Sequence, residues 1–189
     1  KTFGVTSFLS SEGYNLKNKN ITLDNRKKTI FSKKTSELSD LDGNSIFLDN
    51  FEYLSLKKIF KSTGNIKIED NKKNTYLFSQ LIIDTKKKEM IGTDIKAYFN
   101  DKNFKVDKRN KPRIFANSIN FKNSNTHFQK SSMTFCDYRK NDACPPWELL
   151  ARNMSHDQKK KTIYYNNVLL KIYNVPVLFF PYFSHPDPS

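Results

Sequence analysis

Short runs along the chain alternate between apolar and polar residues, and this alternation is its clearest local pattern. Ile66 and Ile68 alternate with charged residues, and the same period of two recurs in 95–100 and 119–122. A period of two places successive side chains on opposite faces of a strand, so these runs predict strands with one apolar face. Convincing helical stretches are almost absent, and the pattern as a whole predicts an all-β fold.

Turn signals separate the alternating runs. A run typically ends in an acidic residue and a small polar residue, often followed by lysines, and this occurs at Asp24, Asp49, Asp70, Asp84 and Asp157. An Asp side chain can accept hydrogen bonds from the backbone of a turn, while lysines at turn tips discourage edge-to-edge aggregation of strands. The spacing between these signals is irregular, which excludes a strict solenoid. We predict an open antiparallel β-jellyroll or twisted sandwich.

The segment "CPPWELLARNMSHD", residues 144–157, fits two structures. As a helix it would place Trp147, Leu150, Ala151 and Met154 on one face, after proline in the first turn. As a strand it would point Trp147, Leu149 and Ala151 the same way. The pattern by itself favours the helix.

The charge of the chain suggests an anionic partner, although its composition weakens that inference. The chain has 189 residues and a net charge of +14, and only five of its 33 basic residues are arginine. Proteins that read nucleic acids favour arginine, because its planar guanidinium binds phosphate and guanine bidentately. The lysines therefore fit solvated turn residues as well as a binding surface. No apolar run approaches the length of a membrane-spanning helix.

Residue patterns typical of catalysis are missing from the sequence. The five glycines form no phosphate-binding loop, and His127, His156 and His185 have no ligand spacing to one another. His156 is expected in a solvated turn. Two cysteines cannot supply the four ligands of a structural zinc site. We therefore expect a non-enzymatic protein without a metal site or a cofactor.

The two cysteines, Cys136 and Cys144, flank the polar stretch "CDYRKNDAC". A disulfide between them would close a short loop and would indicate an oxidising compartment. Free thiols in a reducing compartment are the alternative. The polarity of the loop favours the disulfide.

The segment 144–189 closely resembles a stretch of the LptD family of lipopolysaccharide-assembly outer-membrane proteins, also called OstA. In that family a Trp-x-x-x-Ala strand, a turn and an apolar strand precede a proline-rich segment. The matching positions are Trp147, Ala151, His156, Asp157, Lys161, Val175, Pro176, Val177, Pro181, Tyr182, Phe183, Pro186, Asp187 and Pro188. Phe179 stands where the family commonly has tyrosine. The resemblance favours a strand at Trp147, and the upstream repeats resemble the family's N-terminal domain in style only.

The resemblance implies a division into three parts. Residues 1–18 would be an extension or a first edge strand, 19–173 an OstA-like periplasmic β-jellyroll, and 174–189 a connector to a transmembrane β-barrel absent from this sequence. The connector residues are Val175, Pro176, Pro181, Tyr182, Phe183, Pro186, Asp187 and Pro188. Their prolines are expected to stop ladder pairing and to stiffen the connector. The chain, which begins at Lys1, is thus expected to be an excised N-terminal domain.

The function implied by the resemblance is non-catalytic transport of lipopolysaccharide. The domain, on the periplasmic side of the outer membrane, would receive the lipid from an LptA-like bridge protein that adds a strand to the edge near 19–29. It would pass the acyl chains towards the barrel, in a complex with an LptE-like lipoprotein. The alternating pattern supplies the candidate residues for lining an apolar trough: Ile66, Ile68, Leu81, Ile83, Ile95, Ala97, Phe99, Ile114, Ile119, Phe121, Trp147, Leu149, Ile163, Val168 and Leu170.

Several alternatives remain open at this point. The same apolar residues could form an ordinary dry core. The chain could be a soluble bridge protein of the same pathway, although "PYFSHPDP" argues against this. A basic nucleic-acid-binding β-domain is a different class, in which affinity would fall steeply with salt, but none is expected here. Family members can link N-terminal cysteines to cysteines beyond the barrel, so Cys136 and Cys144 need not pair with each other.

Overall fold

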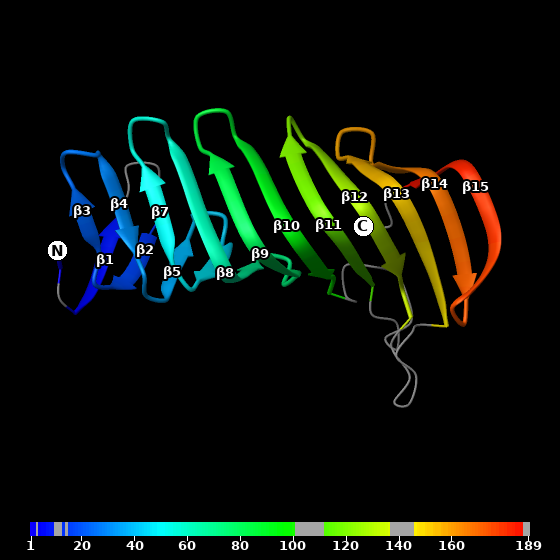
Figure 1. Cartoon of the computed structure of the whole chain (residues 1–189), viewed down its shortest axis with the longest axis horizontal. Coiled ribbons are helices and arrows are strands. Elements are labelled where there is room, and N and C mark those ends of the chain that lie inside the picture. Colours follow the sequence, from blue (N-terminus) through cyan, green and yellow to red (C-terminus); the bar gives the residue numbers. More distant parts are fainter. Residues whose placement is uncertain (3, 10–12, 14, 101–111, 137–145, 187–189) are drawn as a thin grey trace. The chain divides into compact units, whose positions relative to one another are not determined.

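A computed structural model of the chain describes residues 1, 2, 4–9, 13, 15–100, 112–136 and 146–186. These residues form 15 strands and no helix, joined in one antiparallel sheet whose strand order ends at β1 and β15 and does not close on itself (Figure 1). The all-β prediction is confirmed. The strands are β1 Val5–Leu9, β2 Asn15–Lys19, β3 Thr22–Asp24, β4 Thr29–Ser32, β5 Ser36–Ser39, β6 Ser45–Leu48, β7 Phe51–Leu54, β8 Ile59–Glu69, β9 Thr75–Asp84, β10 Glu89–Tyr98, β11 Arg113–Lys122, β12 Asn125–Thr134, β13 Trp147–Asp157, β14 Thr162–Ile172 and β15 Val175–Pro186.

The chain divides into two compact units, Lys1–Thr93 and Asp94–Ser189. In the second unit the long strands β11 to β15 follow one another as neighbouring antiparallel hairpins, visible as adjacent arrows in Figure 1. The segment 147–157 is strand β13, paired with β12 and β14. This confirms the strand implied by the family resemblance, and the helix favoured by the pattern is wrong.

In the first unit, three passes of the chain are each broken into two short strands. The strands β6 and β7 both pair with β8, and the break between them is Asp49–Asn50. The next pass consists of β5, which pairs with β6, and β4, which pairs with β7. The pass after that consists of β2, which pairs with β5, and β3, which pairs with β4. The short strands are therefore halves of longer passes, and β1 and β3 each have one strand partner.

The acidic residues at the strand ends build the turns as expected. Oδ1 of Asp157 accepts hydrogen bonds from the backbone N–H of Lys159 and Lys160, each at 3.0 Å, and Asp24 and Asp84 do the same two and three residues on. Asp70 bonds to the backbone of its own turn and also accepts from the hydroxyl of Tyr76 at 3.1 Å. Asp49 differs, because its carboxylate instead accepts from the backbone of Asn65 in β8.

Burial, reinforced by the Asp70 carboxylate, raises the pKa of Tyr76. The phenol therefore stays protonated and continues to donate to Asp70 at alkaline pH. On the more exposed edge of the same hairpin, the hydrogen bond and charge of Lys67 lower the pKa of Glu69.

Lysine occupies the left-handed position that closes several of these turns. Lys28, Lys58, Lys73, Lys88 and Lys161 all have positive φ, between 48° and 65°. A side chain other than glycine adopts this conformation at a cost of about 1–2 kcal/mol. The turns therefore keep a lysine where glycine would be less strained.

We expect Lys161→Gly to raise the free energy of unfolding by about 0.5–1 kcal/mol, because relief of the left-handed strain exceeds the added entropy of the unfolded chain. Lys160→Gly removes the same charge from the same turn at a residue whose φ is not positive. That control should lower the free energy by about 0.5–1 kcal/mol. Urea denaturation of both variants measures the difference, and equal effects would contradict the strain argument.

Candidate functional site

Inward side chains of β11 to β15 lie in four rows that cross the strands at matched register, and together they form the inner face of the second unit. The first three rows are mostly apolar, and the fourth also holds Thr126, His156 and His185. The rows are Ile114, Met133, Leu149, Leu170 and Leu178; Ala116, Ser131, Ala151, Val168 and Phe180; Ile119, Phe128, Met154, Tyr165 and Phe183; and Phe121, Thr126, His156, Ile163 and His185. In β11 to β14, these side chains are buried or half-buried.

Between the second and third rows the spacing is three residues instead of two. The residues skipped by the ladders form a kink row: Asn117, Lys130, Arg152, Asn167 and Pro181. Lys130 and Asn167 have positive φ, and each follows another exposed residue. Two consecutive outward residues turn the strand so that the inner residues before and after the kink face each other. The contact of Tyr165 in the third row with Met133 in the first row shows this directly.

The first unit follows the same rule. Inner residues fall at 76, 78, 81 and 83 in β9, and at 46, 48, 51 and 53 across β6 and β7. In β8 the register shifts by one residue between Thr63 and Ile66, where Gly64 has a φ of 97°. One inner row of this unit joins Asn18, Ser36, Leu48, Ile66 and Phe78. The row becomes polar towards β2, where Asn18 donates to the carbonyl of Lys34 at 3.2 Å.

None of the residues predicted to line an apolar trough is exposed. Phe99 directly follows β10, and all the others lie on the inward side of a strand. Eight are buried: Ile66, Leu81, Ile95, Ala97, Ile114, Ile119, Ile163 and Val168. Seven are half-buried: Ile68, Ile83, Phe99, Phe121, Trp147, Leu149 and Leu170. The alternation identified the inward side correctly.

The prediction missed other inner residues, among them Phe128, Met154, Tyr165, Phe180 and Phe183. The signal that identifies them is the spacing of two, three and two residues along each long strand. A strict period of two loses the face at the kink, because the parity of the inward positions changes there.

The centre of the inner face is tightly packed around Tyr165. Its side chain is 1% exposed, and its hydroxyl lies 2.8 Å from Sδ of Met133 and 2.9 Å from Nε2 of His185. The Tyr165 and Phe183 rings are 5.7 Å apart, and Val168 beside them is fully buried. These contacts connect β12, β14 and β15, so the inner face is a packed core at this point.

The inner face opens at strand β15, which pairs with β14 alone in the part of the chain that the structure describes. Leu178, in the first inner row, is 53% exposed, whereas its neighbour Leu170 on β14 is half-buried. Val175, Val177, Phe179 and Tyr182 are exposed on the same strand. The apolar rows therefore continue to the last strand without a further strand to cover them among the described residues.

The connector residues Val175 to Pro186 form this strand, so the expectation that their prolines stop ladder pairing is wrong. Pro176 is paired with Lys171, and the register continues from there to Pro186 after a shift next to Leu170. Proline is compatible with an edge strand, because its missing N–H can lie on the side without a partner. Asp187 and Pro188 lie outside the described residues.

The cysteines and histidines occupy unrelated places. Cys136 is half-buried and free among the described residues, while Cys144 lies outside them, so their pairing stays a prediction. His156 is half-buried in β13 and in the fourth inner row; its expected place in a solvated turn is wrong, because β13 continues to Asp157. No cluster of three or more metal-ligating side chains occurs among the described residues.

The described residues include no helix that is long and apolar enough to cross a membrane. No protein-family model matches the chain. The chain is similar to the LPS-assembly protein LptD of a Polaromonas species, with 32% identity over 146 residues, which are 75% of this chain. The similarity supports a relationship to the LptD family. The match spans 16% of the length of that LptD, so this chain corresponds to a small part of its relative.

We expect Tyr165→Phe to lower the free energy of unfolding by about 1–2 kcal/mol, because the loss of the hydroxyl leaves Met133 and His185 without that buried contact. Tyr164→Phe is the matched control, since Tyr164 is the adjacent residue on the opposite face of β14 and is half-exposed. Its effect should stay within about 0.5 kcal/mol. Chemical denaturation of the two variants measures both values; equal losses would show that the Tyr165 contacts do not stabilise the core.

Proposed function

We propose that the chain is a non-catalytic lipid-transport domain on the periplasmic side of the outer membrane. Its inner face would receive the acyl chains of lipopolysaccharide and pass them towards an outer-membrane barrel. The observation that carries the proposal is the set of apolar inner rows, which continue at matched register to the exposed edge strand β15. The sequence similarity to LptD supports the choice of lipid.

The chemistry of the inner face suits acyl chains. Transfer of each methylene out of water is favourable by about 0.8 kcal/mol, so a lipid with several chains needs an apolar surface throughout its passage. The inner rows of β11 to β14 are largely aliphatic, with small side chains at Ala116, Ser131 and Ala151 next to the kink. Hydrocarbon needs no hydrogen bonds and can therefore slide along such a face.

The packed centre restricts how a lipid could bind. Tyr165 and Val168 have almost no exposed surface, so an acyl chain must either displace core side chains or enter where the rows open. On β15, the inner residue Leu178 is exposed, and Phe180 and Phe183 are half-buried. We therefore place the first lipid contacts of the second unit at this edge strand.

The N-terminal unit offers edges to a protein partner. The strands β1 and β3 each have one partner strand, and β3 lies within the 19–29 segment predicted as a docking edge. Leu23 on β3 and Val5 on β1 are exposed. We propose that a bridge protein of similar fold adds a strand here. The proposal also includes a lipoprotein partner in the outer membrane.

A photo-crosslinking amino acid at position 178 is expected to form adducts with purified lipopolysaccharide, while the same amino acid at position 182 should form few. Leu178 and Tyr182 lie on one strand and are 53% and 57% exposed, but only Leu178 belongs to the inner face. Gel shift and mass spectrometry of the adducts give the ratio. Equal yields at the two positions would indicate nonspecific surface association and would contradict the proposal.

A further inference from the structure

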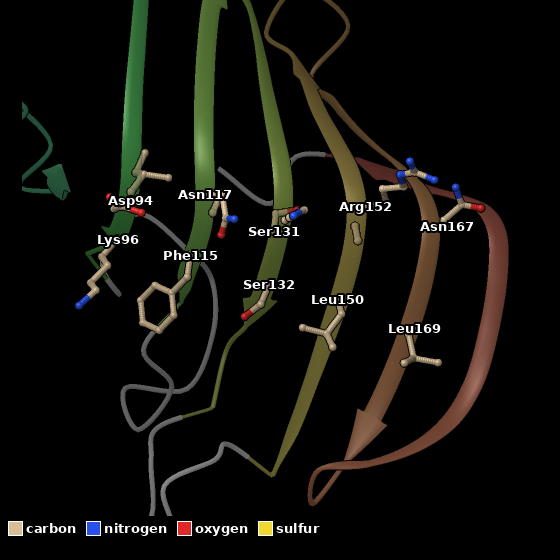
Figure 2. A pocket seen from close by; sticks show the side chains of 14 residues that line it. Asp94, Lys96, Phe115, Asn117, Ser131, Ser132, Leu150, Arg152, Asn167 and Leu169 are labelled. Carbon is tan, nitrogen blue, oxygen red and sulfur yellow. The ribbon is translucent and has the colours of Figure 1, made fainter. Parts of the chain in front are cut away.

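The opposite face of the second unit carries a second arrangement of apolar side chains beside cations. An open depression of about 840 Å³ is lined by residues of β10 to β14. Most of them point outward, and the buried residues Ile95, Ala116, Ser131 and Ala151 form part of its floor. Phe115, Ser132, Leu150 and Leu169 form an outer row at matched register, and they project side by side in Figure 2. The outer row is displaced by one residue from the inner face, so that Leu150 and Leu169 point away from Leu149 and Leu170.

The kink row borders the outer row on one side. Figure 2 shows Asn117, Arg152 and Asn167 above the apolar side chains. Lys130 and Lys96 also line the depression, together with one acidic residue, Asp94. Among the described residues no ion pair involves Lys130 or Arg152, whereas Glu148 and Lys171, on the other side of the outer row, pair with each other at 3.7 Å. The excess positive charge therefore lies along the kink.

Strand pairing determines which ligand fits this surface. The strands β12, β13 and β14 are hydrogen-bonded on both sides, so an extended peptide cannot add to them by strand pairing. A peptide lying across the outer row would bury backbone polar groups without partners, at a cost that an alkyl chain does not have. A second copy of this chain would bring a net charge of +14 to a positive surface.

We propose that this depression binds a single anionic alkyl amphiphile, with its hydrocarbon on the outer row and its anionic head at Lys130 and Arg152. Across three strand spacings of about 4.8 Å, the outer row extends for about 14 Å, a length suited to one alkyl chain. Two cations beside a partly desolvated alkyl chain provide charge-assisted hydrogen bonds for a phosphate or sulfate head. The site lies on the face opposite to the proposed transport face and does not depend on that proposal.

The test uses the purified chain and dodecyl phosphate carrying a photoactivatable diazirine on its alkyl chain, below its critical micelle concentration. We expect labelling at Phe115, Leu150 and Leu169, mapped by fragmentation mass spectrometry. Unlabelled dodecyl phosphate should displace the labelled probe at a concentration about tenfold lower than dodecanol does, which corresponds to about 1.4 kcal/mol of binding free energy from the head group. Labelling confined to Leu149, Leu170 or other inner residues would overturn the outer site while agreeing with the transport proposal.

Two double variants separate the contributions. Lys130→Gln with Arg152→Gln should weaken dodecyl phosphate about tenfold and leave dodecanol unchanged, and Leu150→Asn with Leu169→Asn should weaken both ligands. Lys159→Gln with Lys160→Gln removes the same charge from an exposed turn and should change affinity less than about twofold. Equal weakening by the turn and kink variants would show that only net charge matters and would sink the proposal. The retained β-sheet circular dichroism of each variant confirms that it is folded.

Discussion

The aligned kink is the constraint on which the rest of the second unit depends. Five neighbouring strands skip one ladder pair at the same register, at Asn117, Lys130, Arg152, Asn167 and Pro181. Side chains one residue apart in a strand point in opposite directions, so an extra outward residue is the means by which both halves of the strand keep their apolar side inward. If one strand lacked the kink, half of its apolar residues would face water. The kink must therefore occur in all of these strands together.

The same constraint produces two different surfaces from one set of strands. On the inward side, the halves of each strand meet, and Tyr165 reaches across from its own row to Met133 and to His185 of the edge strand. On the outward side, the kink leaves polar and cationic side chains next to Phe115, Leu150 and Leu169. A packed core and an amphipathic depression thus have a common geometric origin.

The edge strand β15 links this geometry to the proposed function. Its prolines are tolerated because, among the described residues, one side of the strand has no ladder partner, and its apolar residues are exposed for the same reason. An exposed apolar edge favours association with other apolar groups. Because the chain is similar to LptD, we propose that the acyl chains of lipopolysaccharide bind at this edge strand.

The sequence by itself determined the all-β class, most of the turns and the inward side of the runs that alternate without a kink. Period-two alternation needs no long-range information, and Asp157 or Asp84 makes its turn from hydrogen bonds within a few residues. Tertiary structure decided the rest. The choice of strand for 147–157 depended on partners in β12 and β14, because the apolar spacing also fits a helix. The contact of Tyr165 with Met133 joins residues that are far apart in the sequence, and the pairing of Val175–Pro186 occurs in a proline-rich segment. Local strand propensity predicts neither, because both depend on the neighbouring strand.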